Sequence, residues 1–306
     1  MRIGTSVAEP NGPDALAKVA DQLRRAVDEG FASAWMSNIF GLDSLTALAV
    51  AGSQVPGIEL GTAVVPTYPR HPAVLAQQAL TVDLALGGRL ALGIGLSHQI
   101  VIQDMYGYSF DKPARHMREY LAVLVALLAG EQAAFDGATL SAHIGLSTPR
   151  ARAKVPLLLA ALAPQMLLLA GRAADGTVLW MTGPATVRDY IVPAITAAAN
   201  EAGRPSPRVV CILPVSVTDD EGQARADAAK AFAIYGQLPS YRAMLDKEGA
   251  AGPGDVAIVG DEDAVSGQIM ALADAGVTDF VAGEYARGDE GTRTRTLLRK
   301  LVGTLG

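Results

Sequence analysis

The chain has 306 residues, with 25 Lys and Arg against 31 Asp and Glu and a formal charge of -6. A negative field of this kind disfavours nucleic-acid binding, which needs a basic face. Half of the residues are apolar, so the chain can bury a large core and disorder is not expected. A single cysteine, Cys211, excludes an intramolecular disulfide and a multi-cysteine metal site.

No segment has the pattern of a membrane span or a targeting signal. The most apolar stretch, 155–171, contains Pro156 and Pro164 and is shorter than the ~20 residues that a spanning helix needs. The first residues lack a cationic region followed by an apolar one. We therefore expect a cytoplasmic protein that has neither a membrane nor a nucleic acid as partner.

Short apolar runs, often β-branched, alternate with longer amphipathic runs. The expected strands are 2–7, 31–36, 58–65, 89–96, 155–162, 177–181, 208–217 and 279–283. The expected helices are 14–29, 43–51, 72–86, 115–129, 164–174, 185–202, 219–235, 261–275 and 292–301. Strands that are apolar almost throughout are typical of a parallel sheet covered on both faces.

These eight units predict one α/β domain, a (β/α)8 TIM barrel over residues 1–306. The alternative is a doubly wound sheet. It is disfavoured because no strand opens into a GxGxxG turn followed by an acidic residue ~20 positions later.

Two segments interrupt the alternation, at about 131–154 and 237–260. The first contains Asp136-Gly137, a hairpin signal, and the second is rich in Gly and Pro without clear periodicity. Long irregular segments in a compact domain are commonly lids or binding loops. We expect both insertions at the mouth of the barrel, where the strands end.

The mouth of a barrel of this kind carries the functional site. The histidines show no metal-binding spacing, and we expect no metal. Cys211 lies within a strand and is expected to be inert core. Small residues such as Gly93, Gly95 and Gly183 follow or end several strands, where backbone could approach a ligand closely or simply ease a turn. This pattern favours a large organic cofactor that brings its own reactivity.

Three motifs carry a resemblance to a known family. The stretch 86–95, LGGRLALGIG, resembles the [SG]GR-x3-G-x-G strand of the luciferase-like monooxygenase superfamily, and 170–176, AGRAADG, resembles its AGR-x-ADG segment. The stretch 60–74, LGTAVVPTYPRHPAV, resembles the strand and helix of the branch that uses coenzyme F420, a deazaflavin. The resemblance extends from the start of the chain to about residue 183.

The resemblance implies a barrel with an insertion, a homodimer, and F420 as cofactor, with FMN as the alternative. It implies a cis peptide at Ala63-Val64 in a bulge of the third strand, the alternative being an ordinary trans bond. Cofactor contacts are implied or expected at the strand ends: Asn38, Ala63, Val64, Gly95, Leu96, Ser97, Ala161, Leu162, Ala163, Thr182 and Gly183.

Two positions depart from the sugar-phosphate dehydrogenases of this branch. Their acidic residue and His after strand two are replaced by Asn38 and Ile39, and Leu96 stands where a catalytic Glu is expected. That activity is therefore not carried over. An apolar mouth instead favours hydride transfer between the cofactor and a small, apolar, unsaturated substrate.

Two side chains are the candidate catalytic residues. His98 follows the fourth strand and could donate a proton, since its ordinary pKa is near 6.5; its alternative is a solvated loop residue. Glu9 follows the first strand; its alternative is a charge at the entry to a helix, next to Pro10.

Three functions stay open. They are an F420-dependent oxidoreductase, an FMN-dependent monooxygenase served by a separate flavin reductase, and a non-catalytic flavin-binding barrel.

Overall fold

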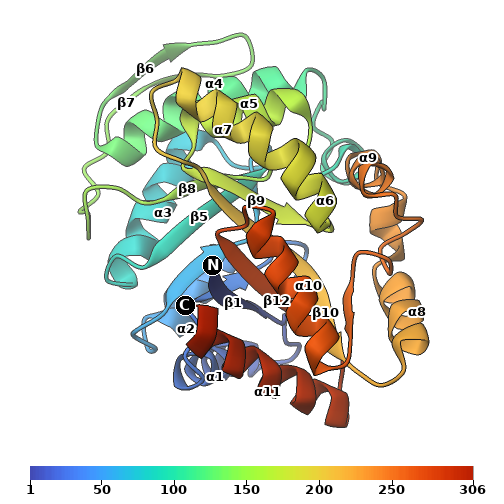
Figure 1. Ribbon diagram of the computed structural model, residues 1–306. Helices are drawn as coiled ribbons and strands as arrows, with labels where there is room; N and C mark the ends of the chain where they lie inside the picture. Colours follow the sequence, from blue (N-terminus) through green and yellow to red (C-terminus); the bar gives the residue numbers. More distant parts are fainter. Residues whose placement is uncertain (306) are drawn as a thin grey trace.

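Within residues 1–305, which the computed structural model describes, eight strand positions close into a parallel barrel surrounded by helices (Figure 1). The strands are β1 (Arg2–Val7), β2 (Ser33–Met36), β3 (Glu59–Thr62) continued by β4 (Val65–Pro66), β5 (Leu90–Gly95), β8 (Leu157–Leu159), β9 (Gly176–Trp180), β10 (Arg208–Val217) and β12 (Asp279–Glu284). Each pairs in parallel with the next, and β12 pairs with β1 to close the ring. The TIM barrel prediction is confirmed.

The helices alternate with the strands. They are α1 (Ala15–Asp28), α2 (Ser44–Gly52), α3 (Pro72–Ala85), α4 (Pro113–Ala129), α5 (Pro164–Ala173), α6 (Pro184–Thr186), α7 (Val192–Glu201), α8 (Glu221–Ala231), α9 (Pro239–Glu248), α10 (Glu262–Asp274) and α11 (Gly288–Leu305). A π-helical turn, η1 (Ile100–Met105), follows β5, a second, η2 (Val187–Ile191), joins α6 to α7, and a 3-10 turn, η3 (Ala233–Gly236), follows α8.

The strands of the barrel bury apolar side chains on both of their faces. The largest core lies between strands and helices. The inner core fills the barrel and consists of Trp35, Ala91, Leu158, Val178, Val210, Ile212 and Val281. Trp35 is the largest of these side chains, and Gly61 on the neighbouring strand leaves room for it, since a Cβ there would come within 2.2 Å of the indole.

A charged network closes the end of the barrel where the strands begin. Asp279 is 2% exposed and pairs with Arg208 at 2.8 Å and with Arg2 at 2.5 Å. Glu59 pairs with the same two arginines, at 2.5 and 3.1 Å. The Arg208 guanidinium also lies 5.4 Å from the Trp35 ring centroid. Charges paired at this end of a barrel serve stability, and the opposite end is left for chemistry.

The first insertion does not lie at the mouth, so that prediction is wrong. It forms the expected hairpin, with β6 (Ala133–Asp136) antiparallel to β7 (Ser141–Ile144). The hairpin packs outside α4, whose buried Glu119 accepts hydrogen bonds from Thr139 N and Oγ1 at 2.7 and 2.6 Å. The chain then returns beneath the start of β5, where Arg152 donates to the carbonyl of Leu90. An insertion between a helix and the next strand lies at the end of the barrel where the strands begin. In Figure 1 the hairpin lies on the side of the barrel opposite α9.

The second insertion lies at the mouth, as predicted, but it is not irregular. It contains α9 and a short strand, β11 (Ile258–Gly260), which pairs in parallel with the end of β10. Leu238 and Pro239 begin α9 and Gly249, at φ 75°, ends it. Proline at the first helical turn and glycine after the last are common helix boundaries, which explains why the Gly and Pro content obscured this helix.

Candidate active site at the barrel mouth

The floor of the mouth is formed where the third barrel strand breaks between β3 and β4. The Ala63-Val64 peptide is cis, as predicted. Ala63 N donates to the carbonyl of Met36 at 2.8 Å, which ties the break to β2. Ala63 and Val64 are partly buried and pack on the inner core together with Trp180. These side chains present a small apolar surface at the centre of the mouth.

The glycines of the GxG motif make room for this break. A Cβ on Gly93 would lie 2.0 Å from the Thr62 carbonyl oxygen, and one on Gly95 would lie 2.7 Å from Val64 Cγ2. The space at both positions is therefore filled by the neighbouring strand. Packing between the strands therefore requires glycine at both positions, and no ligand is needed to explain them.

An aromatic wall stands beside this floor. It consists of Trp180 at the end of β9, Phe232 and Tyr235 from the segment after α8, and Tyr241 of α9. Phe232 and Tyr235 meet the Trp180 ring edge-on, at centroid distances of 5.4 and 5.7 Å. Tyr241 meets Tyr235 edge-on at 5.1 Å, and burial raises the pKa of the Tyr241 hydroxyl. The wall gives the mouth an apolar environment.

The sequence predicts only part of the aromatic wall. Trp180 lies in the expected strand 177–181, which predicts a place in the core or in the wall of the pocket. The other three aromatics come from α9 and the turn before it, which follow β10 and fold back over the end of β9. Their only signal in the sequence is the clustering of aromatics over residues 232–241 in a chain with 5% aromatics.

His98 lies at the end of the aromatic wall. Its ring centroid is 5.6 Å from that of Tyr241. It follows Ser97, which adopts a left-handed backbone with φ 61°, and its carbonyl accepts the first hydrogen bonds of η1. Burial lowers the pKa of His98 below its usual 6.5. The imidazole is therefore mostly neutral at pH 7, with one nitrogen able to donate a hydrogen bond and the other able to accept one.

Glu9 and Asn38 hold the loop after β2. The Glu9 carboxylate accepts a hydrogen bond from Leu42 N. Asn38 Oδ1 accepts from the backbone N and the hydroxyl of Ser44, both at 3.0 Å, at the start of α2. The Glu9 carboxylate thus binds the loop before α2, and no hydrogen bond joins it to the start of α1 within the described residues. No hydrogen bond joins Glu9 to His98 within the described part of the chain.

Two of the expected cofactor-binding segments, 161–163 and 182–183, differ in their surroundings. Ala163 is the N-cap of α5, and no side chain caps that helix. Pro164, the first residue of α5, has no N–H, and Met166 N donates to the Ala163 carbonyl at 2.9 Å. Among the described residues, the N–H of this first turn that is left to bind an anion is that of Gln165. By contrast, the turn at Thr182 and Gly183 leads into α6, where the Glu248 carboxylate accepts from Ala185 N at 3.0 Å and Thr186 N at 2.7 Å. A carboxylate of the chain itself already occupies the second position.

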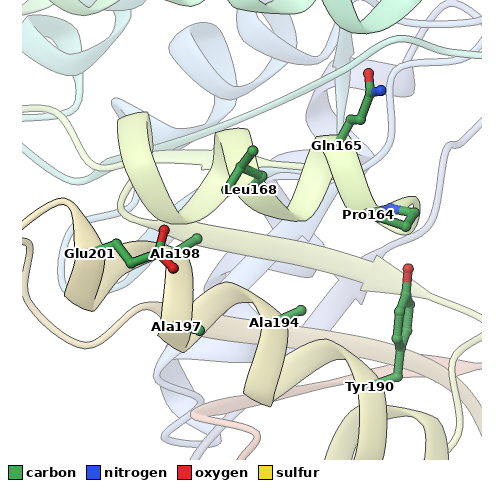
Figure 2. Close-up of a pocket in the computed structure, with 8 residues that line it drawn as sticks. All are labelled: Pro164, Gln165, Leu168, Tyr190, Ala194, Ala197, Ala198 and Glu201. Atoms are coloured by element: carbon green, nitrogen blue, oxygen red, sulfur yellow. The ribbon is translucent and has the colours of Figure 1, made fainter.

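A cation lies near the first loop. Tyr190 donates its hydroxyl hydrogen bond to the carbonyl of Leu162 at 3.1 Å, and Lys247 Nζ lies 4.4 Å from the Tyr190 ring centroid. Figure 2 shows Tyr190 at one end of a depression of about 330 Å³ between α5 and α7, lined largely by Pro164, Leu168 and alanines. This depression lies on the outer layer of the barrel and contains few polar groups, so it is not the candidate active site.

A second histidine lies behind the mouth. His116 Nε2 is 3.0 Å from Thr67 Oγ1, and the Tyr68 ring stacks on the imidazole at 3.9 Å. Burial lowers the pKa of His116 to about 4, and it raises the pKa of Tyr68 to about 12. Both groups are neutral at pH 7. They fix the segment after β4, which continues the broken strand.

Cys211 lies in β10, fully buried, with its thiol 3.5 Å from the Thr182 carbonyl. Burial raises its pKa to about 12, which is consistent with the expected inert role. Within residues 1–305, no group of three His, Cys, Asp or Glu side chains could hold a metal ion, and no helix combines the length and apolar character needed to cross a membrane.

Residues 1–279 match the family model of the luciferase-like monooxygenases, and the chain belongs to this family. A 5,10-methylenetetrahydromethanopterin reductase of Methanolobus tindarius is 27% identical over 319 residues, which cover 95% of this chain and 97% of that protein.

Solved structures agree on the fold. The coenzyme F420-dependent tetrahydromethanopterin reductase of Methanopyrus kandleri superposes with a TM-score of 0.79 at 23% identity, covering 99% of this chain and 98% of the other. The FMN-bound oxygenating constituent of a 3,6-diketocamphane monooxygenase of Pseudomonas putida superposes with a TM-score of 0.77 at 18% identity, covering 99% and 97%. Luciferase-like barrels with either cofactor thus share this architecture.

Proposed function

We propose that the protein is an F420-dependent oxidoreductase that transfers a hydride between the deazaflavin and a small, apolar, unsaturated substrate. The observation that carries the proposal is the apolar floor at Ala63 and Val64, enclosed by the aromatic wall and bordered by His98. The 27% identity with a methylenetetrahydromethanopterin reductase over nearly the whole chain, and the fold shared with an F420-dependent tetrahydromethanopterin reductase, support this cofactor over FMN.

The residues of the mouth fit a flat ring that carries an anionic tail. Ala63 and Val64 would support the ring from below, and the uncapped start of α5 at Ala161, Leu162 and Ala163 would accept the phosphate. We expect Asn38, Leu96 and Ser97 to border the same opening. Gly95 contributes by allowing Val64 to pack closely.

Thr182 and Gly183 would contact the cofactor only if the Glu248 carboxylate moves. The bound deazaflavin would supply a carbon that donates or accepts hydride.

The chain's own residues would manage water and the proton. The aromatic wall keeps the floor apolar, which strengthens electrostatic interactions inside the site. When a hydride is added to one carbon of a double bond, a proton must reach the other atom. We assign this proton to His98, the titratable side chain at the edge of the wall. Glu9 is the second candidate, although its carboxylate is engaged with Leu42 N.

Titrating the purified protein with F420 and with FMN, followed by fluorescence quenching, tests the cofactor. We expect saturable binding of F420 and much weaker binding of FMN. Tight binding of FMN alone would replace this proposal with an FMN-dependent monooxygenase. Binding of either cofactor without any reduction of unsaturated compounds would leave a non-catalytic flavin-binding barrel.

We also propose a homodimer. Val50 of α2 and Val74 and Leu84 of the adjacent α3 are 43%, 57% and 44% exposed. Apolar side chains exposed on two neighbouring helices can form part of a surface that another subunit covers. Sedimentation of the purified chain measures this state, and a monomer at micromolar concentration would contradict it.

A further inference from the structure

A second cleft lies outside the barrel wall, between α1 and α11, which run beside each other in Figure 1. Its volume is about 570 Å³, within the size range of small-molecule sites. Its floor is the outer side of β1 and the end of β12. None of Ala63, Val64, Trp180 and His98 lines it, so it is distinct from the candidate active site.

Arginines dominate the charge of this cleft. Arg25 of α1, Arg287 of the loop before α11, and Arg295 and Arg299 of α11 line it, against Glu29 and Glu284. Four guanidinium groups against two carboxylates leave a local positive excess in a chain whose formal charge is -6. Asp289 and Glu290, in the first turn of α11, are not among its lining residues, and Glu290 bonds to Thr218.

Arg295 neutralises the carboxylates of the cleft and leaves the other arginines free. It pairs with Glu29 at 2.5 Å and with Glu284, and it donates to Thr5 Oγ1 at 3.0 Å. Arg25, Arg287 and Arg299 make no ion pair or side-chain hydrogen bond within the described residues. They approach the cleft from three separate segments of the chain, so their charges converge on one volume.

We propose that this cleft binds a small organic polyanion bearing phosphate or carboxylate groups. A guanidinium group presents a planar fork of donors that matches the paired oxygens of either group. Three such forks without internal partners, around a volume of this size, suit a ligand with two or more negative charges. Gln22, Thr292 and Thr296 also line the facing sides of α1 and α11, but they already donate to backbone carbonyls, so the arginines carry the recognition.

Isothermal titration calorimetry with pyrophosphate and with citrate tests the site. The two probes show whether the cleft binds phosphate groups or carboxylate groups. We expect saturable binding of at least one probe that weakens as ionic strength rises toward 0.15 M. The variant with Arg25→Gln and Arg299→Gln should bind at least ~10-fold more weakly, because each lost charge-assisted pair is worth about that factor. Both arginines are exposed, so the variant should keep its fold and melting temperature.

Arg24→Gln is the matched control. Arg24 is a neighbouring arginine of α1 that pairs with Asp21 at 2.7 Å and does not line the cleft. Its removal should leave the affinity unchanged. The proposal is overturned if neither probe binds, or if the double variant and the wild type bind equally well. F420 and FMN take no part in this measurement, so its outcome is independent of the function proposed for the mouth.

Discussion

The carboxylate of Glu248, on α9, accepts a hydrogen bond from the backbone N–H of Thr186 at 2.7 Å and so caps the turn that follows β9. This contact joins the second insertion to the barrel mouth. It also places a negative charge beside Gly183, where the Glu248 side chain fills the space that a Cβ would take. An anionic cofactor that approached this turn would meet a like charge.

Replacing Glu248 with Gln should therefore have two opposite effects. The free energy of unfolding should fall by about 1.5–3 kcal/mol, because two charge-assisted hydrogen bonds are weakened. The affinity for F420 should rise several-fold, since a like charge near its anionic tail is removed. Urea unfolding and fluorescence titration measure the two effects. Asp246→Asn, an exposed change on the same helix, is the control, and unaltered F420 affinity in E248Q would place the tail elsewhere.

Replacing His98 with Ala should lower turnover by about 10²–10⁴-fold while leaving the Kd for F420 nearly unchanged, as expected for a general acid. Because burial lowers the pKa of His98 below its usual 6.5, the protonated imidazole is the minor form at that pH and becomes more abundant as the pH falls. Turnover limited by this proton should therefore increase as pH falls below 6.5, and the variant should lose that increase. His143→Ala, on the exposed hairpin, is the control. A change of less than about twofold would make His98 a bystander.

Replacing Gly93 with Ala should destabilise the protein by about 3 kcal/mol, because the new Cβ would lie 2.0 Å from a backbone carbonyl that cannot move independently of β3. Gly267→Ala is the matched control. No heavy atom lies within 4 Å of a Cβ at that position in α10, so it should stabilise the helix by about 0.5–1 kcal/mol. The midpoint of urea unfolding measures both. Equal stability of the two variants would show that β3 can shift away from β5.

His116 should make the protein sensitive to acid. Its pKa is about 4 in the folded protein and near 6.5 when unfolded. Between these values only the unfolded chain binds the proton, so stability is complete above pH 6.5 and declines as pH falls toward 4. In His116→Gln the loss of stability between pH 8 and pH 5 should be smaller by about 1 kcal/mol, a figure reduced for partial exposure. Denaturant unfolding at both pH values checks this, and an unchanged difference would contradict it.

The sequence by itself determined the barrel, its strands and the family. Apolar runs such as that of β10 are continuous because both faces of a parallel strand are buried, and this pattern is local enough to be recognised along the chain. The motif containing Ala63 and Val64 likewise predicted the break in the third strand. These features depend on neighbours in the sequence or on motifs that the family shares.

Only the tertiary structure decided which distant residues meet. The first insertion lies away from the mouth because it follows a helix rather than a strand. Glu248 reaches Thr186 because α9 folds back over the end of β9, and this contact between residues 62 positions apart has no local signature. The arginine cleft arises in the same way, since α1 and α11 come from opposite ends of the chain and become neighbours only when β12 pairs with β1. Side-chain contacts at this range follow from barrel closure, which fixes neighbours in space and leaves no periodic pattern in the sequence.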